Sequence, residues 1–257
     1  MKGVQSDLGK AIRYLRLRPG AGLLLARCLA HNLAGRARTL VGARGARCNL
    51  CGWRGARFEA YPDGARLKYG QRCPRCRSSP RYRLFAAYLT SRPEFAERTA
   101  VLMEFAPEPS MRAFLSARFA GTYVTVDLNS PLAAVHTDLM KPGLKPACAD
   151  LILCSHVLEH LPDDRLGLRE LRGLLKPGAW GILQVPMVAG LPATIEYGRP
   201  EPKEHDHFRR YGEDFVERLT ESGFRVEQLR ASSFLAPEET RELALPDFPI
   251  LKAVRPA

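Results

Sequence analysis

The stretch AVLMEFAPEPSMRAFL, residues 100–115, places a short apolar run directly before a turn and a helix. The run VLMEFA (101–106) fits a buried strand, and MRAFLSARF (111–119) fits an amphipathic helix. The turn between them holds two prolines and no glycine. Because strand, turn and helix in this order form the repeating unit of parallel α/β sheets, the stretch predicts the first such unit of a sheet.

The alternation of strand and helix patterns continues toward the C-terminus. Strand patterns occur at YVTVDL (123–128), AAVHTDL (133–139), DLILCSHV (150–157) and WGILQVPM (180–187), and helix patterns occur at 163–175 and 215–224. FRVEQLRA (224–231) and PILKAVRP (249–256) predict a closing antiparallel pair. The fold class is therefore α/β, with a doubly wound sheet that binds ligands at the carboxyl ends of its strands.

A cysteine pattern precedes this sheet. Cys48 and Cys51 form one CxxC pair, and 21 residues later Cys73 and Cys76 form a second. Four thiolates in two such pairs are the ligand set of a tetrahedral Zn²⁺ site. Because four protein ligands close the coordination sphere, we expect the zinc to be structural and not catalytic.

The segment between the two cysteine pairs predicts a hairpin. Residues 58–61 and 66–69 flank a PDG turn, as the strands of a zinc ribbon do. The sequence then divides into a basic helical segment (1–46), a four-cysteine zinc ribbon (47–79), a linker helix (80–98) and the α/β domain (99–257).

Charge is distributed unevenly along the 257 residues. Residues 1–90 carry a net charge of +16, whereas residues 91–257 carry −4. The basic residues of 1–46 predict two short amphipathic helices with a break at Pro19–Gly20. Their basic face is interpreted as a solvated face packed on the rest of the protein, with weak contact to anionic lipid or nucleic acid as the alternative.

Cysteine usage indicates a reducing compartment. The number of cysteines is odd, seven in all, the CxxC pairs suit a metal, and no secretory signal is recognised. The apolar run at 21–26 is too short to cross a bilayer. We therefore expect a cytoplasmic protein without a transmembrane segment.

Three further segments carry a family resemblance. ADLILCSHVLEHLPDD (149–164), LRGLLKPGAWGILQVP (171–186) and HFRRYGEDFVERLTESGF (207–224) resemble, in order and spacing, the class I methyltransferases that use S-adenosylmethionine, of the small-molecule, methyltransferase type 11-like kind. The resemblance covers residues 99–255. It implies a Rossmann-like, seven-stranded sheet and S-adenosylmethionine as cofactor.

The resemblance assigns the first cofactor residues to the opening stretch. Glu104 matches the family's acidic position at the end of the first strand, while Ala106 and Pro107 stand where glycines are usual. Proline has no N–H, and any Cβ limits how closely the backbone approaches a ligand. The turn is therefore either a variant that holds the cofactor's ammonium group through Glu104 and nearby carbonyls, or part of an inactive site. We favour the variant, because further acidic positions of the family are present.

Those positions follow the next strands. The resemblance implies that Asp127, followed by Leu128, accepts hydrogen bonds from the ribose hydroxyls, and that Asp138 with Leu139 receives the adenine amino group. Ser155, at the end of the fourth strand, completes the predicted cofactor set. The alternative for either aspartate is a turn or helix cap.

The predicted catalytic residues lie after the fourth strand and in a later cluster. By resemblance His160 is the candidate base, and Glu159 is its orienting partner or a second acid. His207 is a secondary base candidate. His205 and His207 are also spaced to bind a metal, but acceptor hydrogen bonding or a lid anchor is the preferred interpretation. The Pro- and Gly-rich insert at 188–205 predicts a mobile lid.

These residues favour a methyltransferase that acts on O or N of a small-molecule or glycan-type acceptor. The fourth strand ends in CSHV and lacks the (N/D)PP(Y/F/W) motif of enzymes that methylate base amines of nucleic acids. Two alternatives remain. One is an RNA ring-atom methyltransferase that holds RNA on the basic ribbon. The other is a catalytically inactive binding protein on the same fold.

Overall fold

The computed structural model describes residues 21–63 and 66–257. Contacts divide the chain into two compact units. The ribbon unit comprises the described residues up to Arg83 together with Ala236–Pro246, and the sheet unit comprises Leu84–Leu235 and Asp247–Ala257. The predicted basic helix before Pro19 lies outside the described residues.

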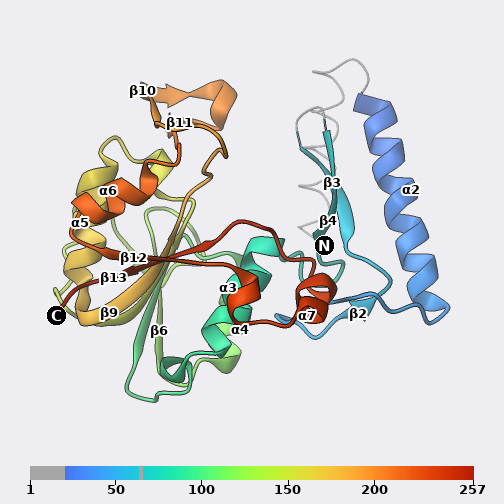
Figure 1. The fold of residues 1–257 in the computed structure, drawn as a ribbon, viewed down its shortest axis with the longest axis horizontal. Helices are drawn as coiled ribbons and strands as arrows, with labels where there is room; N and C mark the ends of the chain where they lie inside the picture. Colours follow the sequence, from blue (N-terminus) through green and yellow to red (C-terminus); the bar gives the residue numbers. More distant parts are fainter. Residues whose placement is uncertain (1–20, 64–65) are drawn as a thin grey trace. The chain divides into compact units, whose positions relative to one another are not determined.

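The sheet unit is built on seven strands in the order β12-β13-β9-β8-β5-β6-β7 (Figure 1). The strands are β5 (Val101–Phe105), β6 (Thr122–Asp127), β7 (Val135–His136), β8 (Ala149–Ser155), β9 (Leu175–Gln184), β12 (Arg225–Leu229) and β13 (Ile250–Val254). The five strands from β7 to β9 run parallel, and β13 is antiparallel to both β9 and β12. The predicted closing pair and the α/β fold class are confirmed.

The strand order places the ligand-binding edge. Starting from β5, the chain first builds outward through β6 and β7, then returns to β8 on the other side of β5. Two neighbouring parallel strands whose connections leave in opposite directions create a crevice at their carboxyl ends. Any site of this domain is therefore expected after β5, β6 and β8.

Helices cover the sheet with their apolar faces. They are α4 (Pro109–Arg118), α5 (Asp164–Leu174) and α6 (Phe215–Glu221), joined by the short turns η1 (Pro93–Phe95), η2 (Leu158–His160) and η4 (Ala231–Ser233). Leu168 and Leu171 of α5 lie about one helical turn apart and are fully buried, as is Leu219 of α6, in the core that contains Leu183 of β9. Burial of these leucines holds α5 against β9 and α6 against β12. Figure 1 shows both helices beside these strands.

The segment after β9 differs from the prediction of a loop. Residues of the insert form β10 (Ile195–Glu201), which pairs antiparallel with β11 (His207–Arg210) across the turn η3 (Pro202–Glu204). Glu196 of β10 accepts from Arg209 and pairs with Arg218 of α6. The strand was missed because these ion pairs join residues that are distant in sequence, while the local Pro and Gly content favours a loop.

The ribbon unit contains a long helix and a hairpin. α2 (Ala21–Leu40) lies alongside the hairpin of β3 (Glu59–Asp63) and β4 (Arg66–Arg72), as Figure 1 shows. The short pair β1 (Ala46–Arg47) and β2 (Arg54–Gly55) precedes it, and α7 (Pro237–Glu242) contacts β1. The predicted hairpin around the PDG turn is confirmed, and α3 (Pro80–Thr90) is found within the predicted linker helix. Among the described residues, no helix combines the length and apolar character that a membrane span requires.

Candidate functional site

A cavity of about 240 Å³ opens at the carboxyl ends of β5, β6 and β8. Five of the predicted cofactor residues line it: Ala106, Asp127, Leu128, Asp138 and Leu139. The predicted base His160 lines it as well, together with His156. The structure thus brings together, at the edge where the strand order reverses, residues that are up to 54 positions apart in sequence.

The turn after β5 is held in an unusual backbone conformation. Ala106 has φ +54°, in the left-handed region, and its N–H donates to the carbonyl of Val126 at 2.9 Å. Glycine is favoured in this region because it has no Cβ. Glu108 then caps α4 by accepting from the N–H groups of Ser110 and Met111, with Pro109 as the first helical residue. The glycine-free turn is therefore closed by an acidic cap and one strained alanine.

Glu104 does not line the cavity. Its side chain is buried within the sheet, where the hydroxyl of Tyr123 donates to it. Burial raises the pKa of Glu104 to about 7, against the lowering effect of the Tyr123 hydrogen bond. Near neutral pH this carboxyl therefore exchanges between its neutral and ionised forms.

The two aspartates each use one oxygen in a local turn. Asp127 Oδ1 accepts from the N–H groups of Asn129 (2.8 Å) and Ser130 (2.7 Å). Asp138 Oδ1 accepts from the N–H of Met140 at 2.8 Å. Both residues therefore play the capping role that was the alternative to cofactor binding, and both also face the cavity. Because a carboxylate has two oxygens, capping through Oδ1 leaves Oδ2 as an acceptor for a ligand.

A second group of polar side chains adjoins the cavity after β8. Glu159, in η2, is completely buried, and neither of its oxygens has a hydrogen-bond partner among the described residues. His156 Nδ1 lies 3.1 Å from Glu159 Oε1, without hydrogen-bond geometry. The ring centroids of His160 and His207 are 4.7 Å apart. Glu159, His160 and His207 each offer a ligand atom, and these atoms lie within 4.8 Å of one another.

Arg209 fixes the two elements that carry this group. It is buried in β11 and donates to the carbonyls of Leu158 (2.9 Å), Leu161 (2.6 Å) and Pro162 (2.9 Å). A guanidinium presents its donors in a rigid plane, so these bonds hold η2 at a defined position against β11. His207 and Glu159 are thereby kept close although they are 48 residues apart.

Burial also affects the histidine group electrostatically. It lowers the pKa of His207, an effect that Glu159 opposes and the neighbouring histidines reinforce. A lowered pKa keeps the imidazole neutral near pH 7, so that one nitrogen has a free electron pair. His207 is thus able to accept a proton or bind a metal ion.

Two predicted cofactor residues, Ser155 and Pro107, do not line the cavity. Ser155 is buried, and its hydroxyl has no partner among the described residues. Conversely, no pattern in the sequence indicated a role for Tyr123 or for the cavity-lining Thr137. Arg209 stands in the segment 207–224 that carries the family resemblance, but only its burial and its bonds to residues 158–162 show that its side chain points inward.

In the ribbon unit, the four cysteines of the CxxC pairs come together. Cys48 Sγ lies 3.6 Å from Cys76 Sγ, and Cys51 Sγ lies 3.7 Å from Cys73 Sγ. A tetrahedral ion with Zn–S bonds of about 2.3 Å separates its sulfurs by about 3.8 Å, whereas a disulfide requires about 2.05 Å. The four cysteines are free of disulfides, so their geometry fits a zinc ion.

Buried polar groups support the cysteine cluster. The hydroxyl of Ser78 lies 3.3 Å from the sulfurs of both Cys48 and Cys76. Arg83 is fully buried over the ring of Phe58, and donates to the carbonyl of Ser78 at 2.9 Å. Burial lowers the pKa of Arg83 to about 10. The negative charge of the neighbouring cysteine thiolates acts in the opposite direction and raises this pKa. These contacts orient the ligands as outer-shell groups do in metal sites.

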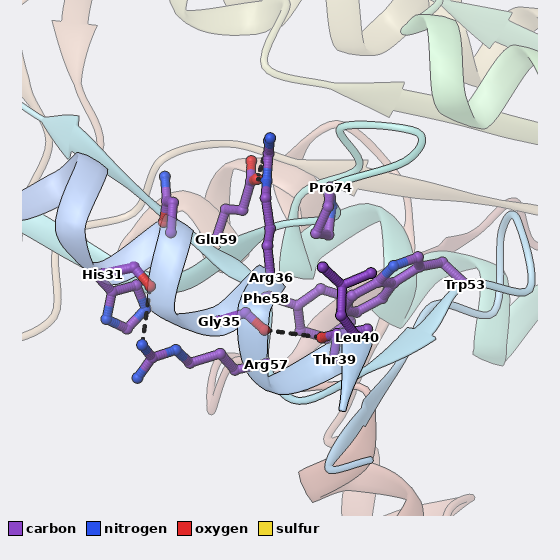
Figure 2. A pocket seen from close by; sticks show the side chains of 11 residues that line it. His31, Gly35, Arg36, Thr39, Leu40, Trp53, Arg57, Phe58, Glu59 and Pro74 are labelled. Atoms are coloured by element: carbon purple, nitrogen blue, oxygen red, sulfur yellow. Dashed lines mark hydrogen bonds and ion pairs between the residues drawn. The ribbon is translucent and has the colours of Figure 1, made fainter. Parts of the chain in front are cut away.

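A separate cavity of about 310 Å³ in the ribbon unit is lined by α2, by residues of the segment 53–59 and by Pro74 (Figure 2). Figure 2 shows the side chains of Trp53, Phe58 and Leu40 around it, with Arg36 reaching Glu59. Glu59 is buried, but its charge is balanced by ion pairs with Arg36 and Arg77. The buried carboxylate at this cavity is therefore paired, in contrast to Glu159.

The comparisons with known proteins concern mainly the sheet unit. Residues 90–183 match the family model of a methyltransferase domain. Fumosorinone synthetase of Cordyceps fumosorosea is 33% identical over 92 residues, which span 35% of this chain and only 2% of that protein.

Solved structures with a similar backbone include the S-adenosylmethionine-dependent methyltransferase of Mesorhizobium loti, at 18% identity and a TM-score of 0.45, covering 67% of this chain and 98% of that one. The [4+2]-cyclase SpnF is similar at 14% identity and a TM-score of 0.47, covering 84% of this chain and 87% of that one. The family match runs from α3 into β9 and includes the strands that form the cavity. Residues 90–183 of the chain are therefore similar to a methyltransferase domain.

Proposed function

We propose that the protein transfers a methyl group from S-adenosylmethionine to an oxygen or nitrogen of a small-molecule or glycan-type acceptor. The observation that carries this proposal is the cavity at the carboxyl ends of β5, β6 and β8, with Asp127 and Asp138 in its lining. Two carboxylates that follow successive strands suit the hydroxyl and amino donors of an adenosine.

The donor set of the cavity fits the cofactor. Asp127 is proposed to accept from the ribose hydroxyls, and Asp138 from the adenine amino group, with Leu128 and Leu139 as apolar contacts beside them. Ala106 and Pro107 are proposed to form the turn near the methionine portion, and Glu104 is proposed to act on its ammonium group although its side chain is buried. The cofactor supplies an electrophilic methyl group on a sulfonium ion.

The chain's own contribution to the reaction is positioning and proton removal. His160 lines the cavity, so it is the candidate base for an acceptor hydroxyl or amine. His207 lies beside it and is a secondary candidate. Glu159 is proposed to orient this pair from its buried position, with His156 as its nearest neighbour.

Calorimetric titration of S-adenosylmethionine into the full-length protein tests the proposal. We expect binding by wild type and at least a tenfold loss in Asp127→Ala, because the ribose hydroxyls lose their acceptor. Asp150→Ala is the matched control, since Asp150 pairs with Lys176 at the opposite end of β8 and does not line the cavity. Absence of binding heat from folded wild type would contradict the proposal.

The ribbon is proposed to bind one structural Zn²⁺ through Cys48, Cys51, Cys73 and Cys76. The sulfur separations and the four-ligand set support this role. The ribbon (47–79) lies in the same compact unit as α2 and α7, and its fold is proposed to depend on the metal.

A further inference from the structure

The buried carboxylate of Glu159 receives no hydrogen bond in the described part of the chain. The side chain has no exposed surface, and both oxygens are buried without a hydrogen-bond partner. Burial of an ionised carboxylate without partners is strongly unfavourable. Other buried acids are compensated: Asp164 accepts from Tyr211 and Arg218, and Glu104 from Tyr123. At Glu159 the nearby group that can supply a positive charge is His156, 3.1 Å away, and it does so only when its imidazole is protonated.

The side chains around Glu159 are imidazoles, which bind metal ions in their neutral form. His160 and His207 offer nitrogen atoms within 4.8 Å of a Glu159 oxygen and of each other. His156 approaches the same carboxylate at 3.1 Å, from a backbone with φ +59°. A non-glycine residue in this region is strained, and such strain is found at sites where a side chain must be aimed.

We propose that Glu159, His160 and His207 bind a divalent transition-metal ion. Two imidazoles and one carboxylate suit Mn²⁺, Fe²⁺, Co²⁺ or Zn²⁺ and leave coordination positions open. The ion supplies the positive charge that the buried carboxylate lacks. The site is separate from the cysteine cluster, which offers only thiolates.

The ligands are held before any ion arrives. Glu159 and His160 belong to η2, and His207 belongs to β11, two elements that Arg209 joins through three carbonyl hydrogen bonds. Glu159 is buried, His207 is half-buried and His160 is exposed. The buried carboxylate is therefore fixed in the protein interior, while an ion from solvent can reach the group at His160. Preorganised ligands on fixed elements reduce the cost of ordering them around an ion.

The position of the ion identifies an acceptor class, and this step rests on the proposed function. His160 belongs both to the ligand group and to the cofactor cavity, so the ion lies next to that cavity. Open positions of such an ion bind oxygen ligands well. The acceptor is therefore inferred to carry a hydroxyl group with a second oxygen next to it, as in a vicinal diol, which chelates the ion and points one oxygen at the cavity.

Titration of Mn²⁺ into the full-length, zinc-loaded protein without S-adenosylmethionine tests the site. Mn²⁺ prefers nitrogen and oxygen to thiolate ligands, so it leaves the zinc in the ribbon. We expect one bound Mn²⁺ per chain by electron paramagnetic resonance. His207→Gln is expected to weaken Mn²⁺ binding at least tenfold. Loss of a residue that only supports a metal ligand already lowers metal affinity by about tenfold or more, and His207 is itself a proposed ligand. The matched control His205→Gln, two residues away and outside the ligand group, retains binding.

Glu159→Gln separates a ligand role from a structural role. If Glu159 is a metal ligand, the neutral amide of Glu159→Gln raises the melting temperature of the metal-free protein. The substitution also abolishes the increase in melting temperature that Mn²⁺ produces in wild type. If Glu159 only supports the fold, the substitution lowers the melting temperature. No Mn²⁺ binding by wild type, equal binding in His207→Gln, or a destabilised Glu159→Gln would each overturn the inference.

The outcome is independent of the cofactor experiment. Mn²⁺ binding without S-adenosylmethionine binding would contradict the proposed function and leave the metal site standing. S-adenosylmethionine binding without Mn²⁺ binding would contradict the metal site alone. A vicinal diol that alters the Mn²⁺ spectrum of wild type supports the acceptor class, and a diol without effect contradicts it.

Discussion

Ala106 carries the strain of the turn that ends β5. Its φ of +54° costs an alanine roughly 1–2 kcal/mol relative to a right-handed conformation. The flanking residues hold it there, because its N–H bonds to Val126 and the following Glu108 caps α4. Position 106 therefore has a backbone conformation that glycine adopts more easily than alanine, although the residue there is alanine.

Ala106→Gly is expected to be neutral or stabilising. Relief of the strain is partly offset by the greater entropy of glycine in the unfolded chain, roughly 0.4–1 kcal/mol, which leaves a gain of about 0.5 kcal/mol. Ala106→Val has a β-branched side chain and should lose more than about 1 kcal/mol. Urea denaturation of the three proteins measures the order. A glycine variant less stable than the valine variant would contradict the backbone assignment.

Glu104 predicts a dependence of stability on pH. Its pKa of about 7 in the folded state lies above the ordinary value of 4.5, so between these values the folded state binds more protons than the unfolded state. Stability contributed by this group is thus present below pH 4.5 and is lost as the pH rises to 7. The shift corresponds to about 3 kcal/mol.

Glu104→Gln should remove this dependence. Relative to wild type, the variant is expected to gain stability at pH 8 and to gain little at pH 4.5, because the protonated acid and the amide are both neutral. Thermal unfolding across that pH range measures the difference, with the exposed Glu217→Gln as control. A variant that is less stable than wild type at pH 8 would show that the ionised carboxyl is not penalised.

At the scale of elements, the hairpin of β10 and β11 is joined to η2 by the side chain of Arg209. This arginine is only 3% exposed and binds three carbonyls of residues 158–162. Its loss leaves those carbonyls with unmet hydrogen bonds in a buried position. The position of the hairpin against η2 therefore depends on this side chain.

Arg209→Met should cost about 2–4 kcal/mol in unfolding free energy, because a buried polar network is broken. Arg210→Met, next to it but half-exposed, should change stability by less than about 0.5 kcal/mol. Hydrogen exchange of η2 provides the local readout, and it should become faster in Arg209→Met only. Equal effects of the two substitutions would contradict a clamping role.

At the scale of the molecule, the division into two compact units predicts that one unit can lose its fold while the other keeps it. Cys73→Ser should lose the bound zinc and the protection of backbone amides in 47–79 from exchange, because folding of a small metal module is coupled to the ion. The amides of β8 and β9, in the other unit, should remain protected.

Cys28→Ser is the matched control for the zinc experiment. Cys28 is buried in the same unit and donates to the carbonyl of Ala60, but it does not belong to the ligand cluster. Metal analysis should find one zinc per chain in wild type and Cys28→Ser, and none in Cys73→Ser. Zinc retained by Cys73→Ser would contradict the four-cysteine site.

Local sequence patterns determined most of the elements of this protein. Apolar runs near 101–105, 122–127 and 149–155 predicted the parallel strands, since a strand buried on both faces needs a continuous run of apolar side chains. The two CxxC pairs predicted a cluster that the structure assembles, because a hairpin brings its ends together whatever surrounds it.

Tertiary structure alone decided how the remaining side chains are used. The sequence predicted a loop where β10 forms. It paired Glu159 with His160, and folding keeps these two residues close while it also places His156 beside Glu159 and His207 within ligand distance. Burial and long-range pairing fix these contacts: Arg209 joins elements about 50 residues apart, and desolvation of Glu159 depends on every element packed around it. Neither the burial of a side chain nor its pairing with a distant residue is a property of a local stretch of chain.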